Sequence, residues 1–263
     1  MDITVQNFAV ANLRRRPLVI ENPSFVAGFD PGTPSPYINY ATPLPGAEPT
    51  GREVAHLVAE FRERGLKPRV EFAVATAPAV EHALRAAGFT TEEVHEYMVC
   101  TPQSLVLPQP PPVPGPALGG FVPRPRVPRT DEEFAAVDAA LAEAFGGEFE
   151  ASPEGAARLR RTQESGGAVR FVPAPGGGCA GAASCSAPAA GTGEVAGVGT
   201  RPAFRGQGVA AAVTGEVAAA MFAQGAGSVW LESSGEGARR VYERLGFRAQ
   251  GVRLYLSLPD VSF

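Results

Sequence analysis

Apolar residues recur at helical spacing in two stretches of the second half of the chain. The first stripe comprises Phe134, Val137, Leu141 and Phe145. Thr130 precedes it with Glu133 three residues on, which is the spacing of a helix-capping box. The second stripe comprises Val209, Val213, Val217 and Met221. Each stripe predicts a helix with one buried face, and residues 154–164 predict a further helix between them.

Short runs of small, β-branched and aromatic residues predict the strands around these helices. They are residues 121–126, 169–173, 179–186, 194–200 and 229–233. Gly176-Gly177-Gly178 lies between two of these runs, and no helix follows it, so a hairpin turn is favoured over a phosphate loop. Residues 169–200 therefore predict an antiparallel meander. The last helix is expected within residues 238–247, where Gly246 ends it.

The chain contains an internal repeat. Gly88-Phe89 and Gly246-Phe247 are 158 positions apart, and the same offset aligns four further pairs: Phe72 with Trp230, Leu84 with Tyr242, Val94 with Val252 and Tyr97 with Tyr255. Upstream, Ala41-Thr42-Pro43 matches Thr200-Arg201-Pro202 with a shift of one residue. A proline-rich stretch separates the copies, so we predict domains at 1–107 and 119–263 with a linker at 108–118.

The most informative turn lies between the predicted strand 194–200 and the helix that begins near Val209. It comprises Arg205, Gly206, Gln207, Gly208, Val209 and Ala210. Glycines let the backbone turn tightly, and a helix N-terminus offers unpaired N–H groups, so this turn predicts a pyrophosphate site. The corresponding stretch of the first copy contains Glu48 and Pro49, a negative charge and a residue without an N–H, which oppose phosphate binding.

These motifs resemble the GNAT superfamily of acetyl-CoA-dependent N-acetyltransferases. Arg205, Gly208 and Ala210 match its Gln/Arg-x-x-Gly-x-Gly/Ala motif, and Tyr242, Gly246 and Phe247 match its helix end. The resemblance implies an α/β fold of the α+β type. It would consist of two tandem GNAT-like domains, each a mixed, mostly antiparallel sheet flanked by helices, with a degenerate N-terminal copy. It also implies acetyl-CoA as co-substrate and no metal.

The resemblance further implies roles for individual residues. The backbone of Val198, Gly199 and Thr200 would pair with the pantetheine arm, where a splay between two strands opens the edge. Residues 205–210 would hold the pyrophosphate, and the Arg205 side chain could add charge. Many relatives carry an asparagine at the position of Gly235, so Ser233 or Ser234 is the candidate replacement in this chain.

Two side chains are candidates for proton transfer. Tyr242 is the candidate general acid, because a phenol is protonated at neutral pH and can donate to a thiolate. Glu194 is the candidate base for the amine, either directly or through a water relay. Glu232 is the second choice, and both carboxylates could instead be solvated strand residues.

Composition narrows the class of partner. The net charge of −4 argues against nucleic acid, and without a run of eighteen apolar residues or a signal-like start we expect a cytoplasmic protein with no membrane partner. The three cysteines and three histidines show no metal-ligand spacing. We predict transfer of acetyl to a primary amine of a small molecule. A non-catalytic acyl-CoA-binding module, acetylation of a protein N-terminus or lysine, and a homodimer stay open.

Overall fold

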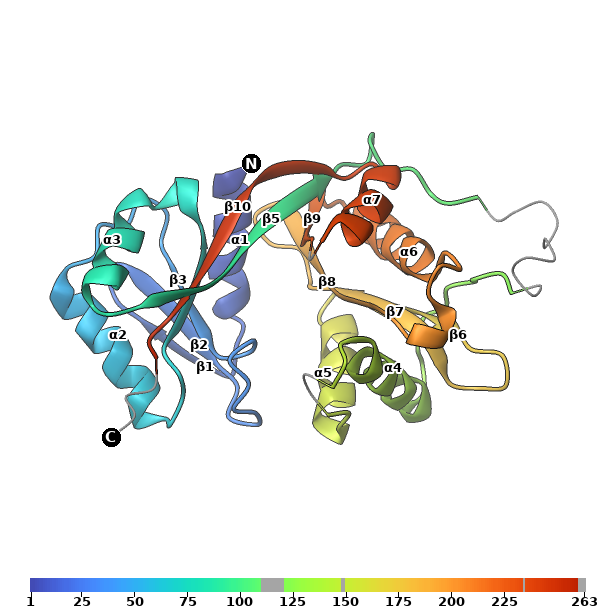
Figure 1. Cartoon of the computed structure of the whole chain (residues 1–263), viewed down its shortest axis with the longest axis horizontal. Helices are drawn as coiled ribbons and strands as arrows, with labels where there is room; N and C mark the ends of the chain where they lie inside the picture. Colours follow the sequence, from blue (N-terminus) through green and yellow to red (C-terminus); the bar gives the residue numbers. More distant parts are fainter. Residues whose placement is uncertain (110–120, 148–149, 234, 260–263) are drawn as a thin grey trace. The chain divides into compact units, whose positions relative to one another are not determined.

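The computed structural model describes residues 1–109, 121–147, 150–233 and 235–259. The chain divides into two compact units, Met1–Tyr97 with Ala249–Phe263, and Met98–Arg248 (Figure 1). It passes from one unit to the other within β5 and again at the start of β10. The predicted boundaries at 107 and 119 stay a prediction, and most of the predicted linker lies outside the described residues.

The first unit is a mixed sheet with helices on both faces. Its strands lie in the order β1-β2-β3-β4-β10-β5, with β3 parallel to β4 and antiparallel pairs β1/β2, β2/β3 and β4/β10. The elements are α1 (Asp2–Leu13), β1 (Leu18–Glu21), β2 (Phe25–Phe29), β3 (Tyr40–Pro43), α2 (Gly51–Glu63), β4 (Arg69–Ala73), η1 (Val74–Thr76), α3 (Pro78–Ala86), β5 (Thr90–Cys100) and β10 (Arg248–Ser257). Phe72, Leu254 and Leu256 pack with α2 and α3 in its core.

The second unit is a sheet with helices on both faces. Its strands lie in the order β5-β9-β8-β7-β6. Its elements besides β5 are α4 (Asp131–Ala144), α5 (Pro153–Glu164), β6 (Ala168–Pro173), β7 (Cys179–Cys185), β8 (Thr192–Thr200), η3 (Pro202–Phe204), α6 (Val209–Ala223), β9 (Ser228–Glu232) and α7 (Glu236–Arg244). One core lies between the sheet and α6 and α7, and a smaller one lies under α4.

Most of the predicted elements of the second unit are present. β6, β7 and β8 form the antiparallel meander. Gly176, Gly177 and Gly178 all have positive φ angles and form the hairpin turn between β6 and β7. Thr130 and Glu133 form the capping box at the start of α4. Each unit is therefore a sheet with flanking helices, as predicted.

Residues 121–126 do not form the predicted first strand. Only Arg126 bridges to Phe171 on β6, through N–H···O contacts of 2.7 and 3.0 Å. Pro123 and Pro125 lack the N–H groups that a ladder requires, which limits the pairing to this one bridge.

α6 is buried on more than the single face that its apolar stripe predicts. Thr214 and Gly215 are buried as well. A Cβ on Gly215 would lie 3.2 Å from the Leu107 side chain and 3.3 Å from Pro108. The segment after β5 also crosses the end of α7, where the N–H of Val106 donates to the Leu245 carbonyl at 3.0 Å. Residues 101–109 are thus part of the second unit.

The repeat is confirmed, with two corrections to its register. The offset of 158 relates α3 to α7, whereas β4 and β9 are 159 positions apart. Phe72 therefore corresponds to Leu231, and both pack into the core beneath their helices; Trp230 is not its counterpart. The cause is one additional residue between β4 and α3, where four residues join the two elements, against three between β9 and α7.

The second correction concerns the strand before the phosphate turn. Ala41 pairs with Val70, and Gly193 pairs with Val229, the equivalent residue of β9. Ala41 therefore corresponds to Gly193 and not to Gly199 or Thr200. Ala41 stands ten residues before Gly51, while Gly193 stands sixteen residues before Val209. The first unit lacks the length of chain that builds the turn in the second.

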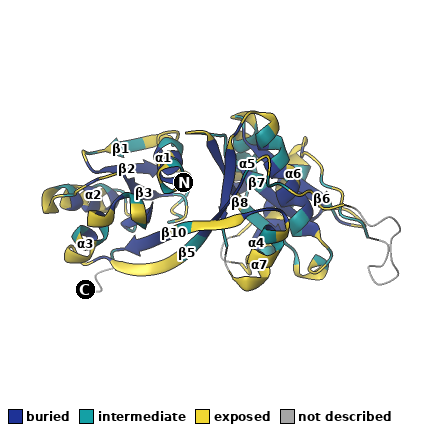
Figure 2. Cartoon of the chain, turned by 90° about the horizontal axis from the view of Figure 1, so that it is seen from above, coloured by how far each residue is buried: buried dark blue, intermediate teal, exposed yellow. Residues whose placement is uncertain are grey.

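The burial of β5 and β10 follows one pattern. Each strand is exposed at its start and buried at its end (Figure 2). Val94 and Val252, which the repeat aligns, are both exposed, and Tyr97 and Tyr255 are both buried.

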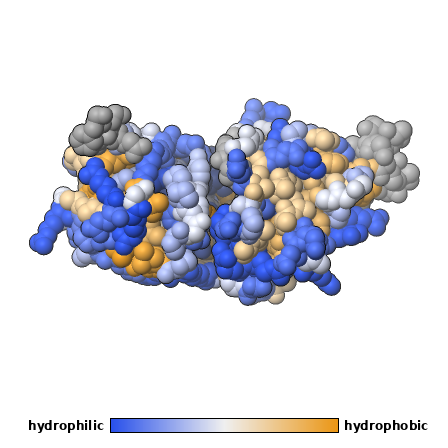
Figure 3. All heavy atoms as spheres, turned by 90° about the horizontal axis from the view of Figure 1, so that it is seen from below, coloured by the Kyte–Doolittle hydropathy of each residue, from blue (hydrophilic) through white to orange (hydrophobic). Residues whose placement is uncertain are grey.

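No helix within the described ranges is long and apolar enough to cross a membrane. The face of each unit in Figure 3 mixes hydrophilic and hydrophobic areas.

Candidate acyl-CoA site in the second unit

The turn between β8 and α6 brings together the residues predicted to hold pyrophosphate. β8 ends at Thr200, η3 follows, and Gly206 and Gly208 have φ angles of 74° and 79°. Left-handed backbone at both positions favours glycine. A Cβ at Gly206 would meet no described atom within 4 Å, and one at Gly208 would meet only Pro123, at 3.8 Å. The space beside both glycines is therefore open apart from Pro123.

The N-terminus of α6 lacks a side-chain cap. Gly208 is its N-cap, and the first turn holds no acidic residue. The first N–H groups of a helix have no intrahelical partner and carry partial positive charge, so this end can bind an anion.

The N-terminus of α2, the equivalent helix of the first unit, is already capped. The Thr50 hydroxyl accepts from the Glu53 N–H, and the Glu53 carboxylate accepts from the Thr50 N–H at 2.8 Å. The Thr50 N–H is the main reason that the pKa of Glu53 lies below its ordinary value. The carboxylate at the N-terminus of α2 is that of Glu53 and not of Glu48. It occupies the place where a phosphate would bind to this helix.

The predicted splay is present between β8 and β9. Their parallel pairing runs from Thr192 opposite Ser228 to Glu194 opposite Trp230, and no later pair is found between the two strands in the part of the chain described. On its other side β8 stays bonded to β7 as far as Thr200. The edge at Val198, Gly199 and Thr200 is thus not covered by β9 and can accept an extended ligand chain.

An extra residue in β8 sets the direction of its side chains beyond Glu194. The register shifts where Ala182 and Ser184 of β7 oppose Gly199 and Ala196, and Gly197 has a φ of 60°. Both Val195 and Val198 consequently face the α6 core. Such a bulge bends the strand and re-aims its residues.

Tyr242 lies on α7 with its ring in the core shared with α6 and β9. Its residue is 6% exposed, and its ring centroid is 6.0 Å from that of Phe247. Burial raises the pKa of the phenol to about 12. No hydrogen-bond partner of the hydroxyl is found among the described residues. Tyr242 therefore stays protonated at neutral pH, with its proton available to a ligand.

The raised pKa of Tyr242 leads to a pH prediction. Because the phenol ionises only near pH 12, kcat should not fall between pH 8 and pH 10 through loss of this proton. The measurement is the pH dependence of kcat for the wild type and Tyr242→Phe. A fall centred below pH 10 that the phenylalanine variant lacks would contradict the assignment.

Glu194 lies on the opposite face of the sheet from Tyr242. Its neighbour Val195 packs into the α6 core, so Glu194 points to the face covered by α4, beside Trp230 on β9. Burial and, to a smaller degree, the charge of Glu194 raise the pKa of the Cys185 thiol, so this cysteine is not a reactive thiolate. Glu232, the second-choice base, lies at the end of β9 with one carboxylate oxygen buried.

Ser233 follows β9, and its hydroxyl donates to the Gly235 carbonyl at 3.2 Å. Ser234 lies outside the described residues. Gly235 has a φ of 143° and caps α7.

The Arg205 side chain does not point into the open turn. Its guanidinium donates to the carbonyls of Thr200, at 3.3 Å, and of Ala144, at 3.1 Å. Gln207 donates to the Ala203 carbonyl at 3.1 Å. The last turn of α4, which the sequence did not associate with the site, is thereby connected to it.

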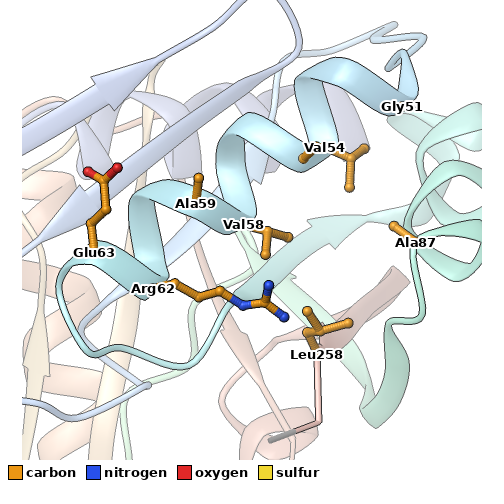
Figure 4. Close-up of a pocket in the computed structure, with 9 residues that line it drawn as sticks. Gly51, Val54, Val58, Ala59, Arg62, Glu63, Ala87 and Leu258 are labelled. Atoms are coloured by element: carbon orange, nitrogen blue, oxygen red, sulfur yellow. The ribbon is translucent and has the colours of Figure 1, made fainter. Parts of the chain in front are cut away.

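A pocket of about 490 Å³ lies in the first unit, away from the predicted site residues (Figure 4). Its walls come from α2, including Arg62, and from Ala87 and Leu258. No group of His, Cys, Asp and Glu suited to a metal ion is found in the described ranges.

Comparisons with known proteins agree with this geometry. Residues 134–247 match the model of the Acetyltransferase (GNAT) family. A GCN5-related N-acetyltransferase from Kribbella flavida has a TM-score of 0.78 at 22% identity, covering 98% of this chain and 96% of that one. One from Sphaerobacter thermophilus has a TM-score of 0.57 at 20% identity, covering 91% and 79%.

A tandem GNAT protein from the clavulanic acid biosynthesis pathway matches 99% of this chain and 89% of its own, with a TM-score of 0.61 at 13% identity. The search of curated proteins found no match. The second unit thus contains a match to an acetyltransferase family that uses acyl-CoA, and the solved structures share the fold of almost the whole chain.

Proposed function

We propose that the second unit transfers an acetyl group from acetyl-CoA to a primary amine of a small molecule. The observation that carries this proposal is the combination of the uncapped N-terminus of α6 with the edge of β8 that β9 leaves open. The N-terminus of α6 binds the pyrophosphate of a CoA thioester, and the open edge of β8 binds its pantetheine arm. Residues 205–210 and 198–200 are the binding elements, with Ser233 at the end of β9.

The residues on either side of this open edge fit the chemistry. The amine nitrogen attacks the thioester carbonyl carbon, so a C–N bond forms and the C–S bond breaks. Glu194, directly or through a water, accepts the proton of the amine, and Tyr242 donates a proton to the departing thiolate. Backbone N–H groups at the open edge of β8 polarise the carbonyl.

A thiol-release assay with acetyl-CoA and a panel of small amines tests the proposal. We expect steady turnover with at least one small primary amine. Turnover only with peptides would favour a protein acetyltransferase. Tight acetyl-CoA binding without turnover on any acceptor would favour a non-catalytic module.

The cofactor assignment makes a prediction about Gly208. Gly208→Val should weaken acetyl-CoA binding by a few kcal/mol, the scale of losing several charge-assisted hydrogen bonds. In the proposed complex the added side chain would crowd the pyrophosphate, and the left-handed backbone at Gly208 is strained for valine as well. Calorimetry measures the change in Kd.

Gly178→Val is the matched control for this strain. Gly178 has a φ of 77° with no atom near its missing Cβ, but it lies in the hairpin between β6 and β7. The Gly178→Val substitution should lower the melting temperature without changing the Kd of acetyl-CoA. Equal affinity of Gly208→Val and the wild type would show that the turn does not bind the cofactor.

A further inference from the structure

The Arg205 guanidinium binds the end of a helix instead of a site for phosphate. Ala144 is the last residue of α4, so its carbonyl has no intrahelical donor. The carbonyls of Ala142 and Glu143 accept from the Gly147 and Gly146 N–H groups, at 3.1 and 3.2 Å. An arginine at this end satisfies the carbonyl and complements the negative end of the helix dipole. The same side chain donates to Thr200, the last residue of β8, so it joins the strand to the helix.

Two further contacts hold the same turn of α4. The Arg201 Nε donates to the Glu143 carboxylate at 2.6 Å. A Cβ on Gly199 would lie 2.8 Å from the Leu141 side chain and 3.0 Å from Ala144, so the absence of one lets α4 lie directly on β8. α4 is therefore fixed on the strand whose free edge is the proposed pantetheine site.

The face of β8 that α4 covers is also the face of Glu194. Gly199, which contacts α4, and Glu194 both point away from the α6 core, in which Val195 and Val198 pack. The last turn of α4, which contacts β8 at Gly197 and Gly199, thus lies on the same face of the sheet as the proposed base. A shift of this turn would change the acceptor side of the site and leave the amides at the start of α6 in place.

We propose that Arg205 is a positioning residue that holds the last turn of α4 on the turn before α6. It thereby fixes the amine-binding side of the site against the side that binds acetyl-CoA. The inference rests on the proposed function. Its side chain acts through the Ala144 and Thr200 carbonyls, and the pyrophosphate is held by backbone amides.

Two substitutions separate this role from charge on the phosphate. Arg205→Ala removes the donors and the charge, while Arg205→Gln keeps an N–H donor without charge. We expect Arg205→Ala to raise the KM of the amine roughly tenfold, Arg205→Gln to recover much of this loss, and both to keep the Kd of acetyl-CoA within about twofold. Arg85→Ala, which removes a surface ion pair with Glu81 in the first unit, is the control. A tenfold weaker acetyl-CoA affinity in both Arg205 variants would overturn the proposal.

Hydrogen exchange tests the contact without reference to activity. In the full chain without ligand, amides in the last turn of α4 should exchange faster in Arg205→Ala than in the wild type, and Arg205→Gln should lie between them. If the wild type shows no turnover, the proposed function fails while this comparison still tests the contact. Unchanged exchange in Arg205→Ala would refute the positioning role. If the wild type turns over, an equal KM of the amine in Arg205→Ala and the wild type would refute it as well.

Discussion

Replacing Tyr242 with phenylalanine is expected to lower kcat on the order of 100-fold and to leave the Kd of acetyl-CoA unchanged. The phenylalanine ring keeps the packing against Phe247 and removes only the hydroxyl, whose raised pKa keeps it protonated. Without this proton the thiolate leaves as a free anion or takes a proton from water. Steady-state thiol release and calorimetry on the full chain measure the two quantities.

Tyr40→Phe is the control for this variant. Tyr40 is a buried tyrosine of the first unit, packed against α1. Its replacement should change stability and not kcat. A kcat for Tyr242→Phe within twofold of the wild type would reduce Tyr242 to a packing residue, as its leucine counterpart Leu84 is in the first unit.

The second large effect is expected from truncation at the predicted domain boundary. Gly119–Phe263 could be expected from the sequence to fold and bind acetyl-CoA alone. The structure argues otherwise, because Met98 and Cys100 are fully buried at the end of β5 beside β9, and residues 101–109 cover α6 and the end of α7. Removing them exposes the β9 edge and apolar surface of α6. We expect this fragment to show no cooperative unfolding transition.

A fragment of residues 90–248 is the matched comparison. It keeps all of β5 and every element of the second unit. It should unfold cooperatively and bind acetyl-CoA. A cooperative transition and wild-type affinity in residues 119–263 would contradict the importance of β5 in this unit.

The division of β5 and β10 between the two units could not be predicted from the sequence. The repeat and the helix pattern were enough to predict two copies. They could not predict that Met98–Cys100 lies in the second unit and most of β10 in the first, because β5 and β10 carry the same pattern of exposed and buried positions. Local patterning specifies a strand but not its partner when two strands are alike.

Within the site, local and distant features were predictable to different degrees. The two glycines before α6 were identifiable because a left-handed turn and an uncapped helix depend on neighbouring residues. The direction of the Arg205 side chain was not, since it depends on where the distant end of α4 lies. For the first unit, the sequence indicated Glu48 and Pro49, but it could not show that Glu53 caps α2 or that the connection is shorter.

Backbone hydrogen exchange with and without acetyl-CoA tests the central claim most directly. If the second unit binds the cofactor as proposed, acetyl-CoA should slow exchange at residues 205–211 and along 195–200, and leave residues 50–54 at the start of α2 unchanged. Protection at the start of α2, or the absence of protection at the start of α6 under saturating acetyl-CoA, would contradict the account.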